Sequence, residues 1–236
     1  YFKLQYKLKL SEEKMEKIEN IYKILLGKFG HQGWWPTNNK YHPNDYFYPK
    51  TEEEKFEICI GAILTQNTAW KNVEKAIENL KQNNALNINS ILRIKEKELA
   101  LLIKPSGYHN QKSRKLKEFA KYYKKNKNNI ERDELLKMWG IGPETADSIL
   151  LYAYKKSYFV IDAYTKRIFS RIGLYNKNIS YSELQNLIQK SIKKDFKIYN
   201  EYHALLVKLG KDICKTKPQC EKCPLNKICY YSFRQK

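Results

Sequence analysis

The sequence predicts an all-α fold of about ten helices joined by short connections. Apolar residues recur at the three- and four-residue spacing that lines one face of a helix through most of the 236-residue chain. Valine occurs only three times and no long stretch alternates apolar with polar residues, so a sheet is not expected to dominate. Two Ser/Thr-x-x-Glu patterns, Thr51 with Glu54 and Ser180 with Glu183, have the form of capping boxes and indicate helix starts.

The first fifty residues are predicted to form a helix followed by an irregular loop. Apolar side chains at helical spacing predict a helix from Ser11 that stops near Gly27 or Gly30. The preceding "YFKLQYKLKL" alternates apolar and basic residues and could form a short strand or an ordered arm. Residues 30–50 are dense in Gly, Pro, Asn and aromatic residues, and loops of about 20 residues are often functional.

The rest of the chain is predicted to be a succession of helices. The capping box at Thr51 opens an apolar helix, and the one at Ser180 opens a helix that runs through Lys193. Further helices are predicted at 72–80, 90–103, 112–125, 132–140, 143–153 and 200–213.

The balance of charges favours a polyanionic partner. Lysine and arginine exceed acidic residues by 45 − 25 = 20, which suits phosphate backbones or anionic membrane surfaces; a solvated lysine-rich surface is the alternative. No apolar stretch approaches the ~20 residues of a membrane span, and the start of the chain lacks the apolar core of a signal peptide. We therefore expect a cytoplasmic protein with no membrane partner.

The stretch "MWGIGPETADSILLYA" (138–153) predicts two helices joined by a very tight turn. Gly140 can end the first helix in a left-handed conformation, and Gly142 lets the backbone approach a partner closely. Pro143 suits the first position of the second helix, whose first-turn N–H groups could hold a phosphate oxygen. Such a contact holds DNA without reading its sequence, but the same residues would also suit an ordinary hairpin in a core.

Four cysteines near the C-terminus have the spacing of a metal site. Cys214, Cys220, Cys223 and Cys229 form a C-x5-C-x2-C-x5-C pattern, which suits either tetrahedral zinc or a [4Fe-4S] cluster. Disulfides are not expected in a cytosolic chain. The fifth cysteine, Cys59, lies among isoleucines and is predicted to be a buried thiol.

Four stretches resemble the endonuclease III superfamily of DNA glycosylases. "LKMWGIGPETADSILLYA" followed by "YFVIDAYTKRIFSRIG" is similar to the family's helix-hairpin-helix and the aspartate segment after it. "GAILTQNTAW" resembles the family's early helix and DNA-facing turn, and "IKPSGYHNQKSRKL" resembles its wedge loop. The resemblance covers roughly residues 50–230.

The resemblance implies two helical lobes with DNA in the cleft between them. Residues 51–158 would form a six-helix barrel that carries the helix-hairpin-helix, and residues 1–50 and 159–236 would form the second lobe. It also implies that the loop 214–229 holds a [4Fe-4S] cluster rather than zinc, although the first gap between cysteines is five residues here and six in the family. The expected partner is double-stranded DNA with a damaged base, bound by a monomer associated with the nucleoid.

Asp162 is the candidate catalytic residue. An aspartate at the start of a helix is most often an N-cap, but by resemblance Asp162 matches the carboxylate that stabilises positive charge on the sugar and activates water. Bifunctional relatives carry at the position of Glu144 a lysine that forms an imine with the sugar. Glutamate cannot do so, and the resemblance therefore implies a monofunctional glycosylase, unless another lysine substitutes.

The aromatic residues suggest a substrate. "GWWP", with Trp34 and Trp35, together with Phe56 offers faces for a flipped base, although core packing is an alternative for the tryptophan pair. The whole set of motifs resembles the 3-methyladenine DNA glycosylase branch, which removes 3-methyladenine and 7-methylguanine. A cationic alkylated purine stacks well on such faces and leaves readily. Lys211 could approach this pocket or contact a phosphate.

The same mapping suggests DNA contacts. Tyr108 is placed like a residue that wedges into the duplex, and Gln66 could fill the gap left by the flipped nucleotide; local packing and helix capping are the respective alternatives. Lys166 could support phosphate binding near Asp162 or simply be solvated. The hairpin contacts are expected from Gly140, Ile141, Gly142 and Thr145.

Three other functions stay open. The chain could excise mismatched thymine, uracil or an oxidised base, or it could be a bifunctional glycosylase and lyase. It could also be an inactive module that only binds damaged DNA.

Overall fold

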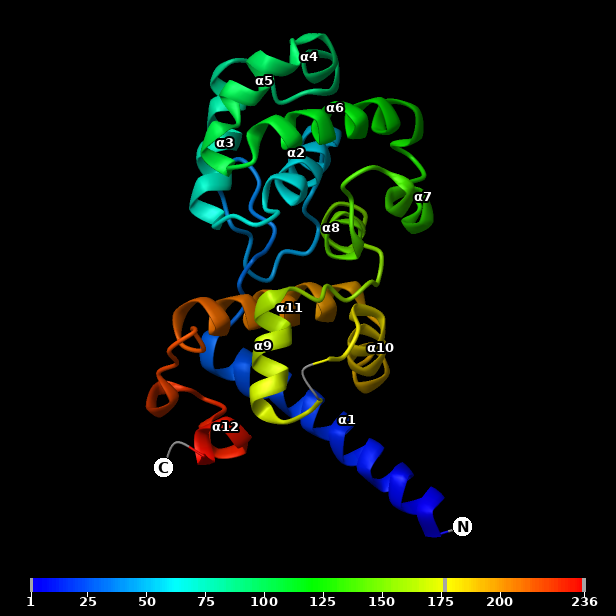
Figure 1. The fold of residues 1–236 in the computed structure, drawn as a ribbon, viewed down its shortest axis with the longest axis vertical. Coiled ribbons are helices and arrows are strands. Elements are labelled where there is room, and N and C mark those ends of the chain that lie inside the picture. Colours follow the sequence, from blue (N-terminus) through cyan, green and yellow to red (C-terminus); the bar gives the residue numbers. More distant parts are fainter. Residues whose placement is uncertain (1, 176–177, 235–236) are drawn as a thin grey trace. The chain divides into compact units, whose positions relative to one another are not determined.

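The structure is a computed structural model that describes residues 2–175 and 178–234 (Figure 1). The described residues form helices and loops, with an isolated bridge between Thr37 and Lys40 but no strand, and the all-α prediction is confirmed. The chain divides into two compact units: the first consists of residues 1–34 and 157–236, and the second consists of residues 35–156. Residues 35–50 thus group with the helices that follow them, whereas the sequence analysis placed them with the N-terminal helix. No helix in the described parts of the chain is both long and apolar enough to cross a membrane.

The first unit contains the two ends of the chain. Helix α1 (Phe2–Phe29) includes the segment expected to be a strand or an arm, because Leu, Gln and Lys are all good helix formers. It packs against α10 (Tyr181–Ser191) and α11 (Phe196–Asp212), and the Tyr202 hydroxyl of α11 donates to the carbonyl of Ile18 at 2.8 Å. The other elements are α9 (Ala163–Ile172), the short turns η3 (Cys220–Lys222) and η4 (Asn226–Ile228), and α12 (Tyr230–Phe233).

The second unit is an α-helical bundle around α2. This helix, α2 (Glu52–Leu64), is buried along most of its length and contains the buried thiol of Cys59, as predicted. The elements that follow it are α3 (Trp70–Gln82), α4 (Ile88–Arg93), α5 (Glu96–Leu102), η1 (Lys104–Ser106), α6 (His109–Asn126), α7 (Arg132–Lys137), α8 (Pro143–Ser148) and the π-helical continuation η2 (Ile149–Ala153).

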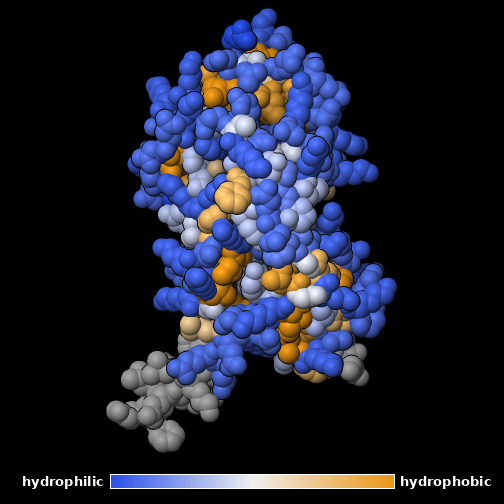
Figure 2. Space-filling view, turned by 180° about the vertical axis from the view of Figure 1, so that it is seen from behind, coloured by the Kyte–Doolittle hydropathy of each residue, from blue (hydrophilic) through white to orange (hydrophobic). Residues whose placement is uncertain are grey.

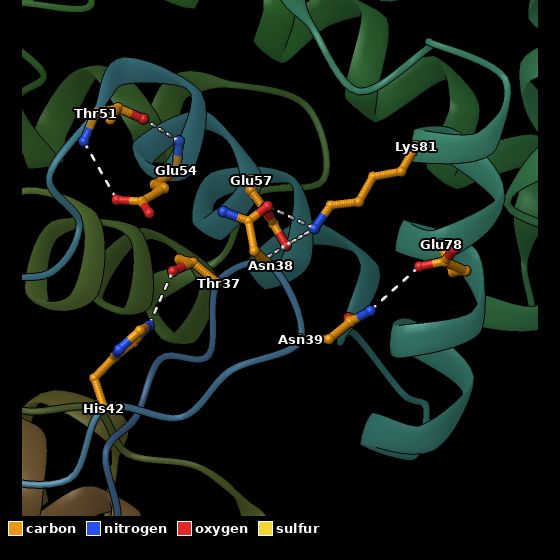
Figure 3. Close-up of polar contacts among 9 residues, drawn as sticks. All are labelled: Thr37, Asn38, Asn39, His42, Thr51, Glu54, Glu57, Glu78 and Lys81. Atoms are coloured by element: carbon orange, nitrogen blue, oxygen red, sulfur yellow. Dashed lines mark hydrogen bonds and ion pairs between the residues drawn. The ribbon is translucent and has the colours of Figure 1, made fainter.

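The loop before α2 is fixed by polar contacts rather than by secondary structure (Figure 3). The backbone N–H of Asn38 donates to Glu57 Oε1 at 3.2 Å, and the Lys81 ammonium donates to the same oxygen at 2.7 Å. Asn39 donates its amide to Glu78 of α3 at 3.2 Å, and the capping box of Thr51 closes the loop. Both α2 and α3 therefore hold this loop, which explains why it belongs to their unit.

The surface of the molecule is mainly hydrophilic. In Figure 2 hydrophilic side chains cover most of the visible face, and apolar side chains gather in separate patches between them. With a net charge of +20, such a surface attracts polyanions, and added salt weakens this attraction.

Candidate active site and DNA-binding elements

The glycine hairpin joins α7 to α8 as predicted. Gly140 has φ +77°, the left-handed conformation that glycine adopts without steric cost, and Pro143 occupies the first turn of α8. Arg132 of α7 forms a bidentate ion pair with Asp147 of α8, Nε to Oδ1 at 2.6 Å and Nη2 to Oδ2 at 3.1 Å. Asp147 is fully buried, so this pair fixes the two helices of the hairpin against each other.

The two glycines of the hairpin have different surroundings. A Cβ on Gly140 would overlap Cε of Lys115, whose side chain passes over the turn. A Cβ on Gly142 would meet no atom within 4 Å, and this residue has an ordinary φ of −95°. Gly140 is therefore required by the fold itself, whereas nothing within the protein requires glycine at 142.

A hydrogen-bond chain links the hairpin to the turn after α2. The Gln66 amide donates to the Gly140 carbonyl and to Thr145 Oγ1, both at 2.9 Å. Lys115 of α6 donates to Gln66 Oε1 at 2.6 Å. In this structure Gln66 thus caps the hairpin, and the Ile141 side chain within the turn is buried. Filling a gap in DNA would require Gln66 to leave these partners.

A buried lysine fixes the predicted wedge loop. The Lys112 ammonium, only 2% exposed, donates to the carbonyls of Leu64 at 2.8 Å and Ser106 at 2.7 Å. Burial, together with the smaller effect of the nearby Lys115 charge, lowers the pKa of this ammonium to about 8. The loop places Tyr108 at φ +46° with 66% of its surface exposed. A left-handed non-glycine residue is strained, and such strain is typical of functional loops.

Asp162 begins α9 as its N-cap. Its Oδ1 accepts from the Thr165 backbone N–H at 2.7 Å, and its Oδ2 lies 3.6 Å from Nε2 of His203. Burial alone would raise the pKa of this carboxyl, but the nearby imidazole of His203 and the contacts of Thr165 outweigh it and lower the pKa below its usual value. Asp162 is therefore a buried carboxylate that stays ionised at neutral pH.

Sequence reasoning missed His203. It lies on the buried face of α11. This helix is distant from Asp162 in the sequence, but in the fold it packs along α9, which begins at Asp162. The only signal in the sequence was a histidine in the otherwise apolar run "YHALLV".

The four predicted cysteine ligands line one small pocket. Cys214, Cys220, Cys223 and Cys229 surround it together with Arg171 and Tyr231. Their thiols are free, and no three His, Cys, Asp or Glu side chains of the described residues form a ready-made site for a metal ion.

Two arginines of α9 hold this cysteine segment. Arg167 donates to the carbonyls of Gly210 at 2.9 Å and Cys214 at 2.8 Å. Arg171, one turn later, donates to the Cys214 sulfur at 3.3 Å and packs over the Tyr231 ring. The helix that begins at Asp162 is thus attached to the cysteine segment.

The structure separates the predicted base-stacking residues. Phe56 is only 2% exposed and packs between Phe119 and Tyr123, with ring centroids 6.5 and 5.0 Å away. Trp35 is buried edge-on against Trp70 and Tyr152. Both side chains belong to the hydrophobic core around α2, where aromatic rings pack against them. Neither therefore presents an exposed ring face to a flipped base. Of the predicted stacking residues only the neighbouring Trp34 is half-buried.

The remaining predicted residues are exposed. Glu144 lies in the first turn of α8, where its side chain faces solvent. Lys166 is exposed on α9, and its backbone carbonyl accepts from the Tyr175 hydroxyl. Lys211 is exposed in the last turn of α11.

Comparison with known proteins identifies the family. A protein of Methanocaldococcus jannaschii named as a DNA repair glycosylase is 44% identical over 93% of this chain and 99% of its own length. Endonuclease III of Thermotoga maritima is 30% identical over 92% of this chain and 94% of its own. The solved structure of Helicobacter pylori 3-methyladenine DNA glycosylase bound to 1,N6-ethenoadenine superposes with a TM-score of 0.66 at 28% identity, covering 85% of this chain and 97% of that one. Residues 60–194 match the profile of the HhH-GPD superfamily of base excision DNA repair proteins, and the chain belongs to this family.

Proposed function

We propose that this DNA glycosylase is monofunctional and removes alkylated purines, principally 3-methyladenine and 7-methylguanine, using Asp162 and water. The observation that supports the chemistry most directly is the state of Asp162, which is buried, ionised and fixed in orientation. Cleavage of an N-glycosidic bond develops positive charge on the sugar. A fixed carboxylate in a poorly solvated position stabilises that charge more than an exposed one would.

The two carboxylate oxygens of Asp162 have different roles in this proposal. Oδ1 accepts the N–H of Thr165 and fixes the plane of the carboxylate. Oδ2 faces His203, whose imidazole favours the ionised form and leaves this oxygen able to orient a water. His203 acts through Asp162 and is a positioning residue.

Glu144 supports the assignment as a monofunctional enzyme. A lyase needs an amine that attacks the sugar carbon, and a carboxylate has none. Two lysines of α6 lie in this part of the unit and are hydrogen-bonded within the protein, Lys112 to two backbone carbonyls and Lys115, which passes over the Gly140 turn, to Gln66. We infer that neither ammonium is free to attack the sugar while these hydrogen bonds are intact.

The preference for alkylated purines is supported by chemistry and by the H. pylori relative, which is a 3-methyladenine glycosylase bound to a modified adenine. Alkylation at N3 or N7 makes a purine cationic, which strengthens stacking on an aromatic ring and makes the base a good leaving group. With Phe56 and Trp35 in the core, Trp34 is the aromatic residue that we propose for this contact.

A bifunctional endonuclease III-like activity is the second candidate, because the T. maritima relative carries that name. Duplexes with single defined lesions distinguish the two. Release of 3-methyladenine with an intact strand supports our proposal. Strand cleavage without added alkali, or a protein–DNA adduct trapped by borohydride, supports the second candidate.

We further propose that Cys214, Cys220, Cys223 and Cys229 hold a [4Fe-4S] cluster. Four thiols around one pocket provide the donor set that such a cluster needs, and the guanidinium of Arg171 would offset part of the negative charge of the thiolates. When bound, the cluster would tie the C-terminal segment together rather than react with DNA. Iron and sulfide in equal amounts in the anaerobically purified protein would support it, and stoichiometric zinc would contradict it.

The hairpin is proposed to hold a DNA phosphate by its backbone. Support comes from the open space at Gly142 and from the bracing of both helices by the Arg132–Asp147 pair. Tyr108, exposed on its strained loop, is proposed to enter the duplex.

A further inference from the structure

A groove lies between α6 and the end of α7, and the site described above does not use it. It is an open hollow of about 480 Å³. Its principal lining residues are Arg114, Lys121, Tyr122, Lys125, Lys137 and Trp139. We call it the α6–α7 groove. Within this unit, Figure 1 shows α4 and α5 lying away from α7.

Trp139 marks the end of the groove next to the hairpin. It immediately precedes Gly140 and leaves 51% of its surface exposed, although an indole of this size is usually more buried. The Arg114 guanidinium lies 4.8 Å from its ring centroid and the Lys115 ammonium 5.8 Å. Basic grooves that carry exposed aromatic rings are an arrangement that proteins use to bind nucleic-acid strands.

The charges of the groove favour a polyanion. Its lining contains four cations and one carboxylate, Glu118, which gives 4 − 1 = +3. Glu118 pairs with Lys121 at 2.8 Å, and Lys137 pairs with Glu134 just outside the groove at 2.6 Å. Even with Glu134 counted, the surroundings keep a charge of +2. Exposed pairs of this kind are weak, and a phosphate can exchange for the carboxylate.

The length of the groove suits several nucleotides. Arg114 and Lys125 are eleven residues apart on α6, which corresponds to roughly 16 Å along the helix. A DNA strand places one phosphate every 3.4 Å or so of axis, and the groove therefore spans about five phosphates.

We propose that the α6–α7 groove binds the sugar–phosphate backbone of the DNA that flanks the damaged base, on the side where the strand leaves the hairpin. Arg114, Lys121 and Lys125 contact phosphates, and Trp139 packs against a deoxyribose. The proposal rests on the proposed backbone contact of the hairpin, but not on which lesion is removed.

The test measures binding to duplexes that carry a stable abasic-site analogue, which fixes the position of the protein without testing base choice. One duplex has about five base pairs on each side of the analogue, and two others add about six base pairs on one side or the other. The groove variant is R114Q/K121Q/K125Q. The control variant R93Q/K95Q/K97Q removes one arginine and two lysines from exposed positions around α4 and α5 of the same unit. Glutamine preserves helix propensity, and thermal melting checks the fold of both variants.

One of the two extensions should tighten binding by the wild-type protein about tenfold or more. The groove variant should lose that gain and keep its affinity for the short duplex, while the control variant keeps both. The slope of log K against log salt on the long duplex should fall by about 2–3, since each phosphate contact contributes about 0.9. W139A should lose part of the gain.

Three results would overturn the proposal. The groove variant could retain the gain from extension, or it could bind short and long duplexes equally less well, as a general loss of charge would cause. The groove variant could also lose binding to an oligoglutamate peptide while it keeps wild-type DNA binding. This result would overturn the proposal and assign the groove to an acidic protein segment. Failure of wild type to bind even the short duplex would instead contradict the hairpin contact.

Discussion

Replacing each hairpin glycine by alanine separates what the fold requires from what DNA requires. Gly140→Ala forces a side chain into φ +77°, which costs about 1 kcal/mol. It also displaces Lys115 and breaks its hydrogen bond to Gln66, a bond from a charged donor worth about 1.5–3 kcal/mol. Gly142→Ala adds a methyl group where no atom lies within 4 Å, at an ordinary φ, and should change the free energy of unfolding by less than about 0.5 kcal/mol.

The two variants should therefore affect different properties: Gly140→Ala should lower the stability of the fold, and Gly142→Ala should lower the affinity for DNA. Gly140→Ala should lower the unfolding free energy by about 2–4 kcal/mol in denaturant titrations, with a fall in Tm of several degrees. Gly142→Ala should melt like wild type yet bind duplex DNA at least about tenfold more weakly, because the methyl group occupies the space through which a phosphate would approach. Wild-type DNA affinity in a stable Gly142→Ala protein would refute the role of this turn. Unchanged stability of Gly140→Ala would refute the account of Lys115.

Three other substitutions test buried groups. His203→Leu removes the imidazole that lies 3.6 Å from Oδ2 and favours the ionised form of Asp162, so its pKa should rise and the acid limb of base release should move to higher pH; an unchanged limb would show that His203 does not act through Asp162. Arg132→Met leaves the fully buried Asp147 carboxylate without its bidentate partner and should cost about 3–5 kcal/mol by chemical denaturation, whereas Arg132→Lys should cost less. Burial lowers the Lys112 pKa from 10.5 to about 8, so the folded state binds fewer protons than the unfolded state between these pH values. The unfolding free energy of wild type relative to Lys112→Met should thus rise by up to about 3 kcal/mol from pH 8 to 10.5, and a flat difference would contradict the buried ammonium.

Local signals in the sequence predicted local structure well. Both capping boxes form as expected, Gly140 is left-handed and Asp162 caps its helix. Each of these features depends on residues within one turn of one another. The alternating N-terminal segment misled because its residues are good helix formers and extend the helix that follows.

Contacts between distant segments could not be predicted in the same way. Phe56 has the composition of a base-stacking residue, but Phe119 and Tyr123, more than sixty residues later, enclose it. Gln66 was expected to fill a gap in DNA or to be a capping amide, and its bonds to Gly140, Thr145 and Lys115 depend on segments more than forty residues away in the sequence. His203 comes to Asp162 only because α11 packs along α9.

The central claim is that Asp162 and water release the base without an amine, and one assay tests it most directly. Wild type and Asp162→Asn are incubated with a duplex containing a single 3-methyladenine, and free base, strand breaks and DNA affinity are measured on the same samples. We predict that wild type releases the base and leaves the strand intact until alkali is added. Asp162→Asn should bind the duplex about as tightly as wild type and release the base at least about a hundredfold more slowly. Equal release by the two proteins, or strand cleavage by wild type without alkali, would contradict the claim.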